Sequence, residues 1–229
     1  MNRNYFTVIC ATFLMCAILI VFYGSMAIKS STAIADGRNK REIYLTFDDG
    51  PSDRVTPVIL DTLKEENVKA TFFIVGSRAE TRRYLVEREI NEGHTVAVHS
   101  YTHDYSQIYS SPESLINDID KCNDLIYDIT GKRTSLYRFP GGSYGLSNRL
   151  ISAVTMHGMR YVDWNASTRD AEIISPTPEQ LYKAAITTPA NPDKIVLLAH
   201  DTTDKTATAK ALKSIIKYYK DEGYIFSKF

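Results

Sequence analysis

The chain has 229 residues, of which 44% are hydrophobic, 24% are charged, 11 are glycine and 8 are proline. This composition excludes collagen-like, low-complexity and mostly disordered proteins, and the length suits one sizeable folded domain. The 27 basic and 27 acidic residues cancel, so the charge pattern gives no sign of a nucleic-acid-binding surface. Of the three cysteines only Cys122 lies beyond residue 16, which excludes a disulfide scaffold and a cysteine-ligated zinc site.

The N-terminus predicts a membrane anchor. Residues 4–28 carry no charge, and 5–28 are long enough to cross a bilayer as one helix. The alternative is a cleavable signal peptide, because Ala33-Ile34-Ala35 has the small-x-small pattern of a cleavage site. We therefore expect a transmembrane segment over 1–28, a polar linker over 29–41 and one folded domain over 42–229. That domain is expected outside the cytoplasm, at the cell membrane, or secreted if the segment is cleaved.

Strand-like and helix-like segments alternate along the rest of the chain. Short runs of β-branched and aromatic residues predict seven strands, at 42–49, 70–75, 95–100, 135–140, 161–166, 194–200 and 224–229. Apolar residues recur every three or four positions between them, which predicts helices. Alternating strands and helices indicate an α/β fold with parallel strands, either a barrel or a doubly wound sheet.

Polar residues gather where the predicted strands end. Asp48 and Asp49 end the first strand, His99 the third and His200 the sixth, and Arg138 lies near the end of the fourth. The carboxyl ends of parallel strands carry the chemistry in such folds, and contributions from so many strands favour a barrel. We predict a distorted (β/α) barrel of about seven parallel strands, preceded by the transmembrane helix.

The ends of the first and third predicted strands carry the chemistry of a metal site. Asp48 and Asp49 diverge on an extended chain, so one can bind a cation while the other stays free as a base. His99 and His103 lie four residues apart, and two imidazoles with one carboxylate form the open three-ligand arrangement of catalytic zinc. Each pattern alone is also compatible with an ordinary turn or a buried histidine.

Four motifs together resemble those of the polysaccharide deacetylases, carbohydrate esterase family 4. They are Thr46-Phe47-Asp48-Asp49-Gly50, His99-Ser100-Tyr101-Thr102-His103, Arg138-Phe139-Pro140-Gly141-Gly142 and Leu198-Ala199-His200. They occur in the family's order and rough spacing, and the resemblance covers about residues 42–229. It implies a distorted (β/α) barrel in which a zinc-like divalent ion serves the hydrolysis of N-acetyl groups on amino-sugar polymers.

The resemblance also implies a role for each matching residue. Asp49, His99 and His103 would be the metal ligands, and Asp48 the base that takes a proton from the attacking water. Arg138 would hold Asp48, and His200 would be the acid that protonates the departing amine. Gly141 would offer its backbone N–H to the tetrahedral oxyanion, Leu198 would line the acetyl pocket, and Asp170 would orient His200, with Asp163 as the runner-up.

Two departures from the family pattern stand out. The family often has an aromatic residue where Gly141 stands, so we expect that wall of the groove to be missing or supplied by Tyr144. The family's Asp-x-x-Asp-Trp motif keeps only Asp170, because Ser167 and Ala171 stand at the other two positions. The missing tryptophan leaves the shape of the acetyl pocket open.

We predict a metal-dependent N-deacetylase acting on a polysaccharide, with peptidoglycan or another N-acetylglucosamine polymer as substrate. Two alternatives remain: an O-acetyl esterase or small amide hydrolase on the same metal site, and a sugar-binding module without activity. An esterase would need less help from His200, so an active His200→Ala variant would favour it. Zinc is the expected metal, although cobalt, nickel or iron suit the same ligands. The sequence indicates no oligomeric state.

Overall fold

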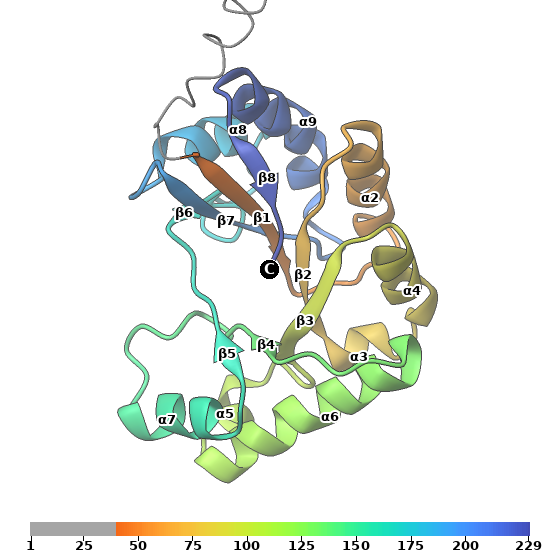
Figure 1. Ribbon diagram of the computed structural model, residues 1–229, viewed down its shortest axis with the longest axis vertical. Helices are drawn as coiled ribbons and strands as arrows, with labels where there is room; N and C mark the ends of the chain where they lie inside the picture. The colour runs from red at the N-terminus through yellow and green to blue at the C-terminus, as the bar shows by residue number, and fades with distance from the viewer. Residues whose placement is uncertain (1–39) are drawn as a thin grey trace, which may run out of the picture. The chain divides into compact units, whose positions relative to one another are not determined.

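The structure is a computed structural model that describes residues 40–229 (Figure 1). The transmembrane segment predicted over 1–28 and nearly all of the linker over 29–41 lie outside these residues. Among the helices of the described part of the chain, none is long and apolar enough to cross a membrane.

Strands and helices alternate as predicted. The strands are β1 Glu42–Asp48, β2 Thr71–Val75, β3 Thr95–Ser100, β4 Leu136–Tyr137, β5 Arg160–Tyr161, β6 Ala166–Ser167, β7 Lys194–His200 and β8 Ile225–Ser227. The helices are α2 Thr56–Glu65, α3 Gly76–Ala79, α4 Arg83–Asn91, α5 Tyr105–Ile108, α6 Pro112–Thr130, α7 Asn148–Met156, α8 Pro178–Thr187 and α9 Thr206–Asp221. Local sequence explains several helix ends: Ser111 and Thr177 cap the starts of α6 and α8 through their side chains, and Gly131 ends α6 in the left-handed conformation.

The strands form one sheet in the order β5-β4-β3-β2-β1-β7-β6, and every pair is parallel. β8 pairs with the first half of β1, while β2 pairs with its second half. The edge strands β5 and β6 do not pair with each other within residues 40–229, so the predicted barrel is an open half-barrel (Figure 1).

The opening has a local cause at the strand predicted over 161–166. The segment is two short strands instead of one, because β5 pairs with β4 at one edge of the sheet and β6 pairs with β7 at the other. Residues 162–165 therefore cross the gap between the edges. The carbonyl oxygens of Val162 and Asp163 accept hydrogen bonds from the Arg138 guanidinium instead of from a neighbouring strand. A buried arginine thus satisfies the backbone where the barrel fails to close.

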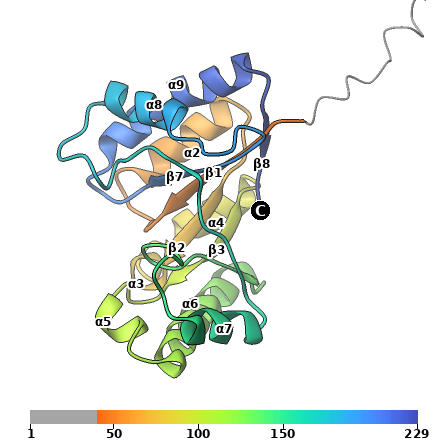
Figure 2. The same ribbon diagram turned by 90° about the vertical axis from the view of Figure 1, so that its left-hand side faces the viewer.

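The main core lies between the sheet and the helices outside it. Contacts run in sequence from α8 to α9, α2, α4, α6 and α7, so these helices follow the outer face of the sheet (Figure 2). The inner face holds a smaller cluster of Phe73, Ala97 and Leu136, with Phe229 packed against it. The carboxyl ends of β1, β3, β4 and β7 share one end of the sheet, and they carry the polar residues that the sequence singled out.

Glu89 is an exception to the apolar character of the core. Its side chain on α4 is fully buried, and within the described residues neither carboxylate oxygen has a hydrogen-bond partner. Burial, together with the negative charge of Asp201, raises the pKa of Glu89 well above its ordinary value. The folded state therefore holds this proton more tightly than the unfolded chain does. Stability is lost as the pH rises above the ordinary carboxyl pKa.

We expect Glu89→Met to stabilise the protein by about 1–3 kcal/mol at pH 8, the usual cost of an unsatisfied buried polar group, and by less at pH 5. Urea unfolding at both pH values measures the difference. Glu87→Met, on the exposed face of the same helix, is the control and should change stability by less than about 0.5 kcal/mol. A Glu89→Met variant less stable than the parent at pH 8 would contradict the expectation.

Candidate metal centre and active site

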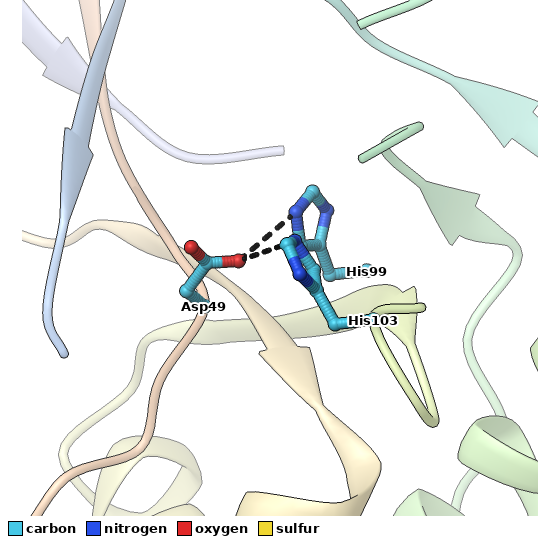
Figure 3. A group of neighbouring side chains, drawn as sticks. All are labelled: Asp49, His99 and His103. Atoms are coloured by element: carbon cyan, nitrogen blue, oxygen red, sulfur yellow. Dashed lines mark ion pairs between the residues drawn. The ribbon is translucent and has the colours of Figure 1, made fainter. Parts of the chain in front are cut away.

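Asp49, His99 and His103 converge at the carboxyl end of the sheet (Figure 3). Their candidate ligand atoms lie within 4.8 Å of one another. The Asp49 Oδ1 atom is 3.3 Å from His99 Nε2 and 2.9 Å from His103 Nε2. Asp49 and His103 lie in the segments that follow β1 and β3, and both have positive φ angles, of 75° and 58°.

The geometry fits a divalent metal ion. The Nδ1 atom of His99 is 2.9 Å from the carbonyl oxygen of Arg138. A carbonyl oxygen only accepts hydrogen bonds, so Nδ1 carries the proton and the Nε2 lone pair faces Asp49. Asp49 Oδ1 is buried and accepts no well-oriented hydrogen bond from the described residues. A carboxylate oxygen and an imidazole lone pair that face each other are stabilised by a cation bound between them. The hydrogen bond from His99 Nδ1 to a backbone carbonyl is the usual way in which a metal-binding histidine is oriented.

The charge of Asp49 is also suited to a cation. Burial would raise the pKa of its carboxyl group, but the neighbouring His103 and His99 outweigh burial and hold the pKa well below its ordinary range. Asp49 is therefore ionised at neutral pH, which is the form that binds a metal ion.

Asp118 on α6 holds the loop that carries His103. Its carboxylate accepts hydrogen bonds from the Ser100 hydroxyl at 2.6 Å, the Tyr101 N–H at 2.7 Å, and the Thr102 N–H and hydroxyl at 2.9 and 2.8 Å. Ser100 Oγ in turn accepts the N–H of His103 at 2.8 Å. Asp118 was not predicted as a site residue, since nothing in its spacing shows that a helix residue 16 positions from Thr102 folds back onto that loop.

We expect Asp118→Asn to weaken zinc binding about 10- to 100-fold, as loss of support behind a metal ligand commonly does. In asparagine an N–H₂ group, which only donates hydrogen bonds, replaces one carboxylate oxygen of Asp118. That group would face the N–H and O–H donors of the loop and could not accept from them. Competition with a chromophoric chelator measures the affinity. The control is Asp124→Asn on the same helix, which removes only an exposed ion pair with Arg133. Equal zinc affinity in the Asp118 variant and the parent would show that the loop keeps its conformation without the Asp118 carboxylate.

Asp48 forms a buried ion pair with Arg138. Arg138 Nη1 donates to Asp48 Oδ1 at 2.9 Å and to Thr46 Oγ1 at 2.7 Å, and both members of the ion pair are almost completely shielded from solvent. The guanidinium also lies over the ring of Phe73, 4.1 Å from its centroid. With its backbone contacts at Val162 and Asp163 this arginine is fixed from several sides, and it holds Asp48 in one orientation.

His200 is paired with Asp170. The distance from His200 Nδ1 to Asp170 Oδ1 is 2.7 Å, and Asp170 Oδ2 accepts the backbone N–H of His200 and the hydroxyl of Thr208. Burial would lower the pKa of His200, but the Asp170 carboxylate raises it to about 9. Asp163 lies elsewhere: it accepts hydrogen bonds from the N–H and hydroxyl of Ser143. Of the two candidates, Asp170 is the one that contacts His200.

Leu198 and Gly141 are the remaining residues that were predicted to belong to the site. Leu198 is two positions before His200 on β7, so its side chain shares the face of the strand that carries His200. Gly141 has a φ of 78°, and a Cβ built there would be 3.1 Å from the Tyr105 hydroxyl oxygen. Tyr144, expected as a substitute wall, is 99% exposed and does not fill this space. Tyr105 was not predicted as a site residue, although it follows His103 by two positions.

Comparison with known proteins gives consistent matches. The family model for polysaccharide deacetylase matches residues 35–162. A peptidoglycan-N-acetylglucosamine deacetylase of Bacillus cereus is 32% identical over 206 residues, which cover 88% of this chain and 74% of that protein. The catalytic domain of a peptidoglycan N-acetylglucosamine deacetylase from Eubacterium rectale superposes with a TM-score of 0.77 at 35% identity, covering 87% of this chain and 94% of that one. A CE4 family pseudoenzyme from Bacillus anthracis has a TM-score of 0.73 at 25% identity, covering 83% of this chain and 64% of that one.

Proposed function

Because this chain belongs to the polysaccharide deacetylase family, we propose that it removes N-acetyl groups from the N-acetylglucosamine of peptidoglycan, with zinc held by Asp49, His99 and His103. The observation that carries the proposal is the Asp49, His99 and His103 cluster beside the residues proposed as base and acid. Asp48 and His200 are register partners at the ends of the neighbouring strands β1 and β7, beside Asp49.

The first half of the reaction needs an activated water. A zinc ion at these ligands would act as a Lewis acid that polarises the acetyl carbonyl and acidifies the attacking water. Asp48 is the base that accepts the proton of this water. The Arg138 contact to Oδ1 fixes its orientation and leaves the other carboxylate oxygen available.

The second half of the reaction expels an amine, which is a poor leaving group until it is protonated. His200 supplies this proton, because the Asp170 carboxylate on its Nδ1 keeps the imidazolium form stable and leaves Nε2 free to donate. The backbone N–H of Gly141 is the donor proposed for the tetrahedral oxyanion, and Leu198 is proposed to contact the acetyl methyl group.

The location of the enzyme is part of the same proposal. Peptidoglycan lies outside the cytoplasmic membrane, and an uncharged segment of membrane-spanning length precedes the folded domain. We place the catalytic domain outside the cytoplasm, held at the membrane by residues 1–28. Protection of this domain from protease added to the cytoplasmic side is the expected result, and digestion from that side would contradict it.

The activity is tested by acetate release from purified peptidoglycan and from an N-acetylglucosamine tetramer. The full chain is stripped of metal and then given zinc, cobalt, nickel or iron(II) in parallel. Release that requires the ion and is largest on peptidoglycan is expected. Release from an O-acetylated xylan alone would favour the esterase reading. Polymer binding without release under any ion would place the chain with the family's pseudoenzymes.

A further inference from the structure

Tyr105 connects the metal centre to the loop that contains Gly141. It is the first residue of α5, and its ring stands edge-on to that of His103, with 5.5 Å between the centroids. On its other side the ring meets Tyr109 edge-on at 5.8 Å, and the Tyr109 hydroxyl donates to the carbonyl oxygen of Pro140 at 2.7 Å. The Tyr105 ring is therefore held between a metal ligand and a second tyrosine that is tied to the 138–142 loop.

The Tyr105 hydroxyl occupies the space that a side chain at position 141 would fill. A Cβ on Gly141 would be 3.1 Å from the hydroxyl oxygen and 3.2 Å from Cε1. The space left by the absence of an aromatic side chain at position 141 is therefore occupied by Tyr105. The phenol approaches the same place from α5, and 49% of Tyr105 is still exposed, so a substrate can reach it.

Two hydrogen-bond donors in this place have no protein acceptor in the described part of the chain. The hydroxyl of Tyr109 is bonded, but that of Tyr105 makes no such bond, and the N–H of Gly141 is likewise without an acceptor. The phenol is a hydrogen-bond donor at neutral pH, because the ordinary pKa of tyrosine is about 10. A free O–H and a free N–H thus lie close together beside a metal ligand.

We propose that Tyr105 is a catalytic residue, whose hydroxyl donates a hydrogen bond to the acetyl oxygen as that oxygen gains negative charge, beside the N–H of Gly141. The inference rests on the proposed deacetylation, and no bond to Tyr105 is made or broken. A donor aimed at developing charge strengthens in the transition state, so its loss lowers kcat more than it raises KM.

The test compares Tyr105→Phe with Tyr144→Phe, a control that removes the hydroxyl of a fully exposed tyrosine. We expect Tyr105→Phe to lower kcat on the N-acetylglucosamine tetramer at least about tenfold, with KM changed less than about threefold. The Tyr144 control should stay within about twofold of the parent. Unchanged kcat in Tyr105→Phe would overturn the proposal, as would a higher KM with kcat intact, which would make Tyr105 a sugar-binding residue only.

Binding of acetohydroxamic acid gives a readout that does not depend on turnover. Its carbonyl oxygen is the same kind of acceptor, and calorimetry on the zinc-loaded full chain should show binding about fivefold weaker in Tyr105→Phe, the loss of one ordinary hydrogen bond. Zinc affinity should equal that of the parent.

An inactive parent protein would refute the deacetylase function, and with it this role. An active parent with an equally active Tyr105→Phe variant refutes the role of Tyr105 alone.

Discussion

Asp48→Asn and Asp49→Asn are both expected to abolish measurable acetate release, but only Asp49→Asn should lose the metal. Asp49 Oδ1 is the atom on which His99 and His103 converge, so its replacement by an amide should weaken zinc binding at least about 100-fold. Asp48 is tied instead to Arg138, and its replacement should leave zinc affinity within about threefold of the parent.

The loss expected from Asp48→Asn has a different origin. An amide cannot accept a proton from water, and removal of a general base typically costs 10²- to 10⁴-fold in rate. Asparagine can still accept the hydrogen bond from Arg138 through its amide oxygen, so the shape of the site should be retained. Chelator competition and acetate release on the same preparations separate the two variants.

Asp53→Asn is the matched control for this pair. Asp53 lies on the same segment after β1, but its carboxylate is exposed and pairs with Arg82 and Tyr84 away from the metal centre. It should keep both zinc and activity. If an Asp48→Asn variant released acetate at more than about a tenth of the parent rate, Asp48 would be ruled out as the general base.

Local sequence signals predicted most of the fold. The long strands β1, β3 and β7 lie within a residue of their predicted bounds, since buried parallel strands have dense runs of β-branched residues between turn residues. The start of α6 at Ser111 and its end at Gly131 follow from capping chemistry that is contained in the chain itself. The prediction that the polar residues meet at one end of the sheet followed from the fold, because parallel strands bring their carboxyl ends together.

The parts that the sequence did not predict depend on tertiary contacts. One run of strand-like residues over 161–166 has the composition of a single strand, and nothing local shows that its two ends pair with opposite edges of the sheet. A distorted barrel was therefore predicted, and the structure is an open half-barrel. Asp118 and Tyr105 were missed for the same reason: their importance lies in what α5 and α6 pack against.

Removing the charge of Asp170 is expected to change the pH dependence of the reaction more than any other substitution. His200 must be protonated to donate to the leaving amine, so kcat/KM should fall as the pH rises through the pKa of His200, which is about 9. Burial lowers that pKa and the Asp170 carboxylate raises it. In Asp170→Asn burial still lowers the pKa, and only the weaker effects of Asp48 and Asp49 remain to raise it, so the alkaline limb of the profile should move toward the ordinary histidine pKa of about 6.5.

The size of the effect follows from the fraction of protonated imidazole. At pH 8 most of the parent molecules carry the proton, whereas a histidine with a pKa of about 6.5 carries it in only a few per cent, so we expect kcat/KM to fall about 30-fold or more. The loss should be smaller at pH 6, because both proteins are then largely protonated. A variant without the acid would instead lose activity equally at every pH. The shape of the pH profile thus distinguishes a lowered pKa of His200 from the loss of the proton donor.

Asp163→Asn provides the control, since Asp163 is the other carboxylate that the sequence offered as a partner of His200. Its contacts are to Ser143 on the 141–143 turn, and its replacement leaves the His200–Asp170 pair untouched. The alkaline limb of its kcat/KM profile should stay at the parent pH. A limb that moved in Asp163→Asn and stayed in place in Asp170→Asn would mean that His200 takes its proton affinity from the other carboxylate, against the 2.7 Å contact in the structure.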